Sequence, residues 1–395
     1  AAVTAGTFSS ALDHFIAFGQ NESRAGSGVT AVINPGTTSQ FTTNADNFTG
    51  TANADTFNGV NGSTDTFTVI DILNGGAGTD TLNVVLDDNA SVFPAATISN
   101  IENIVVRELA NGTSIDTTAF GGETALVSDR STGAITFTGV ADGTALTIRG
   151  DESTTNGAFT ATHANSVATI NLGIENGTTA GAINIGDGND SITTVNITSS
   201  GADNTVGAID LNSDGNTASV TALNVNATTD LTTGNITNFT GTTSTITVTG
   251  AGDVDLGTIE NTTVRTISGA NSTGGITATL NSNTALVVTG GSGNDSFTTG
   301  AILGATGSVD AGDGTDTLTV GTSGHITATV GARYTNFETL AVGNNVSLDM
   351  DHVAGITSVR FTDSNAGNNT TVTDMSAAQA ANVTARDIEG AFTLG

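Results

Sequence analysis

The stretch "LNGGAGTDTLNV", residues 73–84, places three glycines and one aspartate directly before alternating apolar positions. Glycine loses more conformational freedom on ordering than any other residue, so this density beside a carboxylate requires a compensating interaction. After Asp80, the apolar residues Leu82 and Val84 lie two positions apart, which predicts a strand with one buried face. The stretch therefore predicts a tight, ligand-binding turn followed by a strand.

Short alternating runs such as "AITFTGV", "SITTVNI" and "STITVTG" recur along most of the chain. The 395 residues include 51 glycines, only two prolines, 16 phenylalanines, one tyrosine and no tryptophan, which is too few aromatic rings for a wide globular core. We therefore expect an all-β fold, either an elongated β-solenoid or β-roll-like body or a set of β-sandwich modules. The periodic glycines favour the solenoid.

Four segments differ in sequence texture. We expect a short helical segment over 1–25 (the end of an upstream helical domain or a docking element, with a helix over 9–19), a β module over 26–125, a repetitive β region over 126–285 and a second β module over 286–395. The two modules share one order of acidic residues: Asp55, Asp80 and Glu102 in the first, and Asp295, Asp316 and Glu338 in the second. This order indicates an internal repeat.

The charge of the chain limits its partners. Thirty-eight acidic residues against eight basic ones leave a formal net charge of −30, and all eight basic residues are arginine. Such a chain repels nucleic acid and anionic lipid, because both bind proteins through Lys and Arg. Divalent cations are the partners that this charge favours, and an acidic, halotolerant surface is the alternative. No apolar run is long enough to span a membrane, no signal peptide is visible, and the absence of cysteine excludes disulfides.

The opening stretch contains one copy of a nine-residue pattern, G-G-x-G-x-D-x-U-x, where U is a large apolar residue. "GGAGTDTLN" (75–83) and "GGSGNDSFT" (290–298) fit it completely, whereas "IGDGNDSIT" (185–193) and "AGDGTDTLT" (311–319) lack only the first glycine. Degenerate copies place Asp46, Asp55 and Asp65 ahead of the first complete copy. The pattern therefore occurs in both β modules and in the region between them.

The spacing of the pattern suits calcium. Glycines let the turn expose its carbonyl groups while the aspartate points back into the same loop, and calcium takes six to eight such oxygens. One turn cannot supply them all, so the ion would lie between two stacked turns. The candidate calcium ligands are Asp55, Asp65, Gly75, Gly76, Gly78, Asp80, Gly186, Asp187, Gly188, Asp190, Gly290, Gly291, Gly293, Asp295, Gly312, Asp313, Gly314 and Asp316. The alternative is a plain turn, since Asp-Gly and Asn-Gly occur in turns of any β protein.

These nonapeptides resemble the calcium-binding repeats of RTX proteins, which bacteria export by type I secretion. Over 50–106 the order "DTF", "LNGGAGTDTL" and "ISNIENI" resembles the β-strand repeats of RTX-type S-layer and extracellular-matrix proteins. The resemblance implies a secreted chain located outside the cell or on its surface. Complete copies are isolated here rather than in tandem, so we expect the calcium turns to be embedded in a larger β structure.

Enzyme signatures are weak. The pairs Asp87/Asp88 and Asp253/Asp255 could serve glycoside hydrolysis, but that reaction uses an aromatic-lined cleft, and tryptophan is absent. The arginines are scattered singly, and His14, His163, His325 and His352 lie far apart without metal-ligand spacing. We therefore expect no catalysis.

The sequence favours a secreted structural protein that self-assembles with calcium into a bacterial S-layer or extracellular filament. Its expected partners are further copies of itself, calcium and cell-surface polysaccharide, with no nucleic acid and no membrane insertion. Two alternatives stay open: an adhesin segment of a large RTX protein, and a secreted polysaccharide-degrading enzyme.

Overall fold

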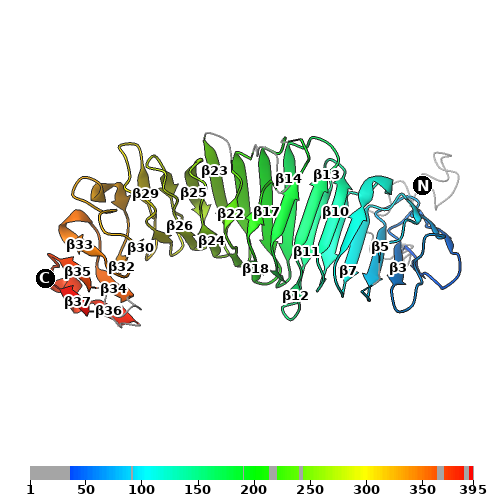
Figure 1. Cartoon of the computed structure of the whole chain (residues 1–395), viewed down its shortest axis with the longest axis horizontal. Helices are drawn as coiled ribbons and strands as arrows, with labels where there is room; N and C mark the ends of the chain where they lie inside the picture. The colour runs from blue at the N-terminus through cyan, green and yellow to red at the C-terminus, as the bar shows by residue number, and fades with distance from the viewer. Residues whose placement is uncertain are drawn as a thin grey trace, which may run out of the picture.

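The computed structural model describes residues 36–89, 92–189, 191–212, 220–239, 243–362, 369–386 and 391–394. They form a parallel β-solenoid of about 14 turns, which Figure 1 shows as an elongated rod with its strands stacked along the long axis. The solenoid expected from the periodic glycines is confirmed, and the alternative of sandwich modules is not what forms. The helix expected over 9–19 lies outside the described residues.

The long sheet contains fourteen strands and extends along most of the rod. Its strands, in spatial order, are β1 (Thr38–Gln40), β3 (Thr56–Asn61), β5 (Thr81–Leu86), β7 (Asn103–Glu108), β9 (Ala125–Asp129), β11 (Ala145–Arg149), β14 (Thr169–Glu175), β17 (Thr194–Ser200), β20 (Ala222–Ala227), β23 (Ser244–Gly250), β25 (Val264–Ser272), β27 (Val287–Thr289), β29 (Ser308–Asp310) and β31 (Tyr334–Thr335). The long sheet passes without interruption through the expected segment boundaries at 125/126 and 285/286.

The second sheet contains eleven strands. They are β12 (Thr155–Asn156), β15 (Thr179–Ala180), β18 (Asn204–Val206), β21 (Leu231–Thr232), β24 (Val254–Thr258), β26 (Ile276–Thr279), β28 (Ser296–Thr298), β30 (Thr317–Val320), β32 (Thr339–Val342), β34 (Ser358–Thr362) and β36 (Val383–Arg386). Because the second sheet begins near residue 155, turns in the first third of the solenoid differ in cross-section from the later turns.

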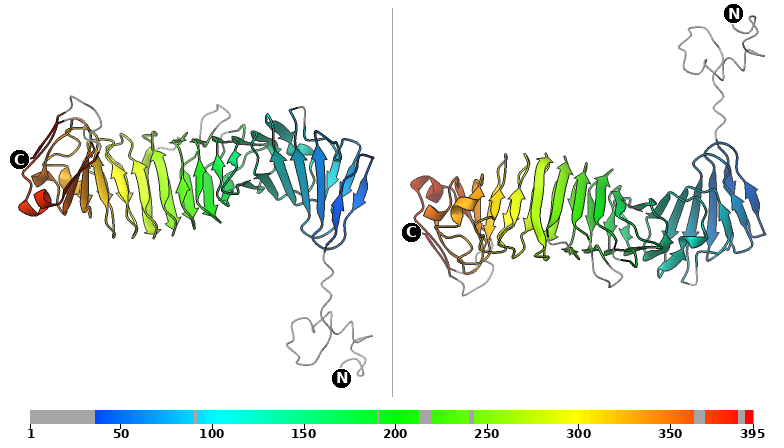
Figure 2. Two further views of the ribbon diagram at one scale, coloured as in Figure 1. Left: turned by 90° about the horizontal axis from the view of Figure 1, so that it is seen from below. Right: turned by 90° about the horizontal axis from the view of Figure 1, so that it is seen from above.

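Three smaller sheets complete the turns. The six-stranded sheet consists of β8 (Thr113–Asp116), β10 (Ile135–Val140), β13 (Phe159–His163), β16 (Ile183–Gly186), β19 (Ile209–Asp210) and β22 (Ile236–Thr237). The two three-stranded sheets consist of β2 (Asn47–Thr49), β4 (Ile72–Asn74) and β6 (Thr97–Ser99), and of β33 (Ser347–Asp349), β35 (Asn369–Thr373) and β37 (Ala391–Leu394). Figure 2 shows from two sides that strands of successive turns stack along the rod.

Helical structure is confined to short segments among the described residues. These are three 3-10 turns, η2 (Thr117–Ala119), η3 (Gly331–Arg333) and η4 (Met350–His352), and one helix, α2 (Ala377–Ala381). Helix α2 is not among the elements predicted from the sequence, although Ser376 and Gln379 form a capping box at its start. That Ser-x-x-Gln pattern was the available signal.

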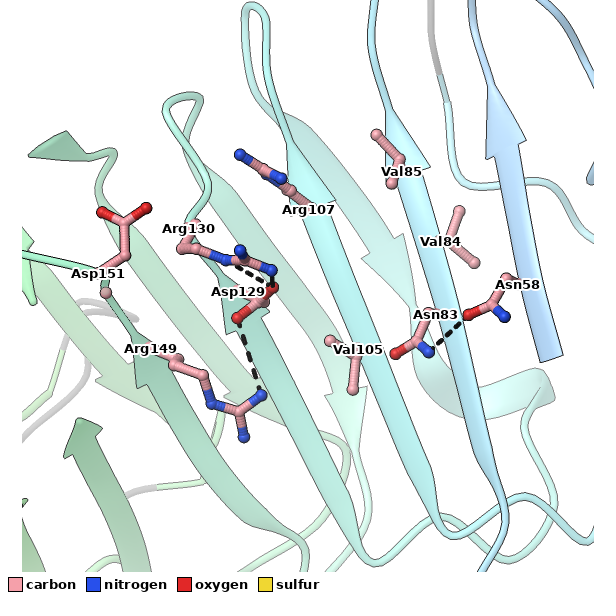
Figure 3. A pocket seen from close by; sticks show the side chains of 11 residues that line it. Asn58, Asn83, Val84, Val85, Val105, Arg107, Asp129, Arg130, Arg149 and Asp151 are labelled. Carbon is pink, nitrogen blue, oxygen red and sulfur yellow. Dashed lines mark hydrogen bonds and ion pairs between the residues drawn. The ribbon is translucent and has the colours of Figure 1, made fainter. Parts of the chain in front are cut away.

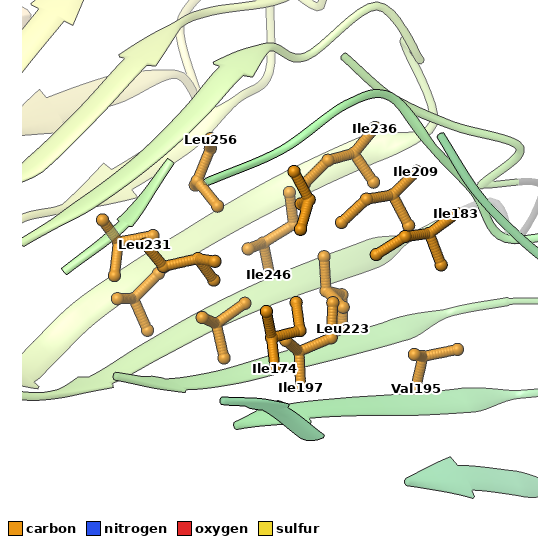
Figure 4. Packing of buried hydrophobic residues seen from close by; sticks show 14 of the residues in the cluster. Ile174, Ile183, Val195, Ile197, Ile209, Leu223, Leu231, Ile236, Ile246 and Leu256 are labelled. Atoms are coloured by element: carbon orange, nitrogen blue, oxygen red, sulfur yellow. The ribbon is translucent and has the colours of Figure 1, made fainter. Parts of the chain in front are cut away.

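The core is a thin column of mainly aliphatic side chains, with single buried phenylalanines such as Phe137 and Phe297 placed along it. Along the long sheet, Val195 pairs in register with Leu223, Leu223 with Ile246 and Ile246 with Ile267. All four side chains are at most 1% exposed, and Figure 4 shows the first three inside the solenoid. Burying each such side chain contributes about 1.5–3 kcal/mol, so stacked aliphatic rows supply most of the packing energy.

Stacking also pairs polar side chains on the outer face of the long sheet. Asn196 Nδ2 donates a hydrogen bond of 2.8 Å to Asn171 Oδ1, and Asn224 Nδ2 donates one of 2.9 Å to Asn196 Oδ1. Parallel, in-register strands place like residues above one another, so amide ladders form as they do in other stacked β structures. These ladders hold adjacent turns in register.

Candidate metal centre

The aspartates of the glycine-rich turns lie immediately before strands. Asp55 and Asp80 precede β3 and β5 of the long sheet, whereas Asp295 and Asp316 precede β28 and β30 of the second sheet. All four residues are at most 1% exposed. The same sequence motif is therefore used twice, at the entrances of two different sheets.

In the first module, the carboxylates connect three successive turns. The Asp55 N–H donates to Asp80 Oδ1 over 2.7 Å, and the Asp80 N–H donates to Glu102 Oε2 over 2.7 Å. The Asp55 carboxylate accepts from the N–H groups of Thr37 and Thr51, the latter over 2.5 Å. Each acidic side chain thus receives a backbone N–H from the preceding turn, and together they form an acidic ladder along the solenoid axis.

The second module repeats this acidic ladder at the second sheet. The Ile276 N–H donates to Asp295 Oδ1 over 2.6 Å, the Asp295 N–H to Asp316 Oδ1 over 2.6 Å, and the Asp316 N–H to Glu338 Oε2 over 2.8 Å. Glu102 and Glu338 therefore occupy equivalent positions. Neither glutamate is among the ligands predicted from the sequence, although the equal spacing of 22 residues from Asp80 and from Asp316 is a signal for both.

Further aspartates form similar hydrogen bonds between turns outside the two ladders. Asp46, one of the degenerate copies, donates its N–H to Asp71 Oδ1 over 2.8 Å at the entrance of the sheet formed by β2, β4 and β6. Ahead of β21 and β24, the Asp253 N–H donates to Asp230 Oδ1 over 2.8 Å. Neither Asp71 nor Asp230 stands in a glycine-rich motif, so only the stacking of turns reveals them.

The first glycine of the motif allows the carboxylate to approach the backbone closely. A Cβ on Gly75 would lie 2.0 Å from the Asn100 carbonyl oxygen and 2.5 Å from Asp80 Oδ2. A Cβ on Gly290 would lie 1.9 Å from the Ala311 carbonyl oxygen and 2.2 Å from Asp295 Oδ2. At both glycines, a carboxylate oxygen and a carbonyl oxygen from the next turn converge on the same small space.

The remaining predicted ligands lie apart from the ladders. Asp65 is exposed and accepts only from the Gly62 N–H, over 2.9 Å, and Asp313 is also exposed. Asp187 is buried, and its carboxylate accepts from Ser191 and Asn189 of its own turn and from the backbone of Val167 in the preceding turn. Asp190 lies outside the described residues. The structure therefore gathers Asp55 with Asp80 and Asp295 with Asp316, and it places Asp65, Asp187 and Asp313 outside the two ladders.

Burial dominates the ionisation of the ladder residues. Burial raises the pKa of Asp80 and Asp295, and it raises the pKa of Asp316 to about 6, with further repulsion from the carboxylates of Asp295 and Glu338. At Asp55 burial also opposes ionisation, but the hydrogen bonds from Thr37 and Thr51 outweigh it and lower the pKa to about 2. At Asp80, Asp295 and Asp316 the surroundings therefore disfavour the charged form of the carboxylate.

The donor chemistry of the ladders fits a hard divalent cation. Oδ2 of Asp80 and Oδ2 of Asp316 are both buried without a hydrogen-bond partner, so each is an anionic oxygen still able to bind a cation. Carbonyl and carboxylate oxygens are the ligands that calcium takes. Because no group of three or more His, Cys, Asp or Glu side chains suited to a metal occurs within the described ranges, an ion there would take most of its ligands from main-chain carbonyls.

Comparison with known protein families finds no family model that matches the chain, and comparison with curated proteins finds no match either. Over the parts of the chain that the structure covers, no helix is long and apolar enough to cross a membrane.

Proposed function

We propose that this chain is a secreted structural protein that assembles with calcium into a bacterial surface layer or extracellular filament. The observation that supports the proposal is the pair of buried acidic ladders in a continuous parallel solenoid. A rod of stacked turns is suited to a structural role, because each turn contacts only its neighbours and the rod can be lengthened turn by turn. Because the buried carboxylates of each ladder repel one another, a bound cation would stabilise such a rod.

Calcium would be held by Asp80 Oδ2 and by Asp316 Oδ2, together with carbonyl oxygens of the neighbouring turn. Bound calcium supplies positive charge next to carboxylates that are otherwise buried without compensation. The hydrogen bonds from the Asp55 and Asp295 N–H groups orient the two carboxylates by holding their Oδ1 atoms. Folding of the turns and binding of the ion would then be coupled.

The histidine contacts support the proposal that the chain is not an enzyme. His163 is buried, with Nδ1 3.4 Å from the Gly186 carbonyl oxygen, and His325 Nδ1 lies 3.0 Å from Thr299 Oγ1. His163 and His325 thus each contact a carbonyl or hydroxyl oxygen, and His352 Nε2 lies 3.7 Å from Asp349 Oδ2, three residues earlier in the chain. Structural contacts of this kind account for them without a reaction.

The test is electron microscopy of the purified chain with calcium and with a chelator, together with the double variant Asp80→Asn/Asp316→Asn. We expect ordered sheets or filaments with calcium, dispersal with chelator, and no assembly of the double variant. Asp142→Asn, which removes one carboxylate charge from an exposed turn, is the control and should assemble normally. A chain that stays monomeric with calcium and binds a cell surface would refute assembly in favour of an adhesin, and degradation of a polysaccharide would favour the enzyme.

A further inference from the structure

A hollow of about 530 Å³ lies on the outer face of the long sheet, across β3 to β11. Arg107, Arg130 and Arg149 line it together with Asn58, Asn83 and Asp129 (Figure 3). The volume is within the range of small-molecule binding sites, about 300–1,000 Å³. The hollow contains none of the ladder carboxylates, so its chemistry is separate from that of the glycine-rich turns.

The hollow concentrates positive charge in an otherwise acidic chain. It gathers three of the eight arginines of a chain whose net charge is −30. Arg130 Nη2 lies 2.6 Å from Asp129 Oδ2, and Arg149 Nη1 lies 3.7 Å from Asp129 Oδ1. Arg107 has no ion pair within the described residues, and its Nε is shielded from solvent without a hydrogen-bond partner. Among the three arginines of the hollow, Arg107 is therefore the one without an ion-pair partner.

Strand register explains why Arg107 lacks a partner. Arg149 pairs in register with Asp129 on one side and Glu175 on the other, so charges alternate from strand to strand. Arg107 pairs with Val85 on its far side, where the alternation ends. Asp129, the nearest carboxylate in this row, already contacts two other arginines. Arg107 is thus the unpaired end of an alternating row.

The local backbone brings the third arginine to the same place. Arg130 has a φ of 49°, a left-handed conformation that costs a non-glycine residue about 1–2 kcal/mol. Successive residues of a strand normally point to opposite faces, yet Asp129 and Arg130 both line the hollow. The structure thus maintains a strained residue that adds a guanidinium to this surface.

We infer that this hollow binds an acidic saccharide, with the carboxylate or sulfate group of one sugar unit on Arg107 and the sugar hydroxyls on Asn58, Asn83 and the neighbouring aspartates. A planar guanidinium binds carboxylate or sulfate through two parallel N–H donors. Asn58 and Asn83 offer amide donors and acceptors, and Asp129 and Asp151 offer acceptors for hydroxyl protons. This inference does not depend on the proposed function, because neither calcium nor assembly enters it.

The lining distinguishes an acidic sugar from other ligands. No aromatic ring is among the residues that line the hollow, so a neutral sugar would lack the stacking surface that usually holds it. An acidic peptide would place its carboxylates close to Asp129 and Asp151 and would carry few hydroxyl donors. A ligand with one anionic group and several hydroxyls satisfies both the arginine and the aspartates.

The test is calorimetric titration of the full chain, at one calcium concentration, with a short oligogalacturonate, its methyl-esterified neutral form and a sulfated oligogalactan. We expect an acidic oligomer to bind and the neutral form not to bind. Arg107→Gln should weaken binding by about tenfold or more, the loss typical of a charged hydrogen bond. Arg265→Gln is the matched control, because Arg265 is an exposed arginine of β25 in the same sheet, and it should bind as the unmodified chain does.

A second variant guards against a folding defect in Arg107→Gln. Val85→Glu places a carboxylate on the strand beside Arg107, where it should pair with the guanidinium and block binding while the melting temperature stays unchanged. Equal binding of the neutral and acidic oligomers, undiminished binding by Arg107→Gln, or no binding by the unmodified chain would overturn the inference. Tighter, Arg107-dependent binding of a poly-aspartate peptide would also overturn it, because the site would then serve an acidic protein surface.

Discussion

Replacing Asp316 by asparagine should change stability in opposite directions with and without calcium. The folded-state pKa of Asp316 is raised from 3.8 to about 6, chiefly by burial. The contribution of protonated Asp316 to stability is therefore fully present below pH 3.8 and is lost as pH rises through about 6. At 1.36 kcal/mol per pKa unit, ionisation at pH 7 costs about 3 kcal/mol without a cation. Asparagine keeps an oxygen for the Asp295 N–H but carries no charge. Asp316→Asn should therefore stabilise the metal-free chain by up to about 3 kcal/mol.

With calcium the sign should reverse, because the variant lacks the anionic Oδ2 that would bind the ion. The assay is denaturant unfolding at pH 7 followed by circular dichroism, once with a chelator and once with calcium, and compared with the exposed control Asp142→Asn. Repetition at pH 3, where Asp316 is protonated in both states, should remove the advantage of the variant. Equal destabilisation of Asp316→Asn in chelator and in calcium would refute the reasoning.

Three other predictions concern the turns, the core and pH. Gly75→Ala should lower the melting temperature strongly, because its Cβ would lie 2.0 Å from the Asn100 carbonyl oxygen. Gly121→Ala is the control and should leave the melting temperature unchanged, because nothing lies within 4 Å of its Cβ. Equal melting temperatures of the two variants would contradict this steric argument. Leu223→Ala, in the aliphatic column, should cost about 2–5 kcal/mol in unfolding experiments, and a loss below 1 kcal/mol would indicate that the core is not close-packed. Burial lowers the pKa of His163, so the free energy of unfolding should fall as pH drops below about 6.5. His163→Gln should remove this part of the dependence of stability on pH. An unchanged dependence in the variant would count against a buried neutral imidazole.

The acidic ladders could be predicted in part. The glycine-aspartate turns are local features, so the placement of Asp80 and Asp295 directly before strands followed from the pattern alone. The equal spacing from Asp80 to Glu102 and from Asp316 to Glu338 also contained the third member of each ladder. The hydrogen bonds between turns could not be read from the sequence, because they join residues 21 to 25 positions apart whose alignment depends on every intervening loop.

Asp65 shows the limit of spacing arguments. It follows Asp55 by ten residues in a similar sequence context, yet it is exposed, while Asp46 pairs with Asp71 and Asp55 pairs with Asp80. Similar sequence context therefore did not identify which aspartates are stacked. What decides the pairing is the number of residues in one solenoid turn, which is 25 for both pairs.

By itself, the sequence determined the all-β class, the thin aliphatic core and the position of the glycine-rich turns, because alternation and turn chemistry act over a few neighbouring residues. The tertiary structure decided which residues meet between turns. Paired residues are 18 positions apart at Thr38 and Thr56 but 28 apart at Thr194 and Ala222, so no constant period aligns the chain. For this reason three arginines that look scattered in the sequence gather in one hollow, and the two modules place the same acidic motif on different sheets.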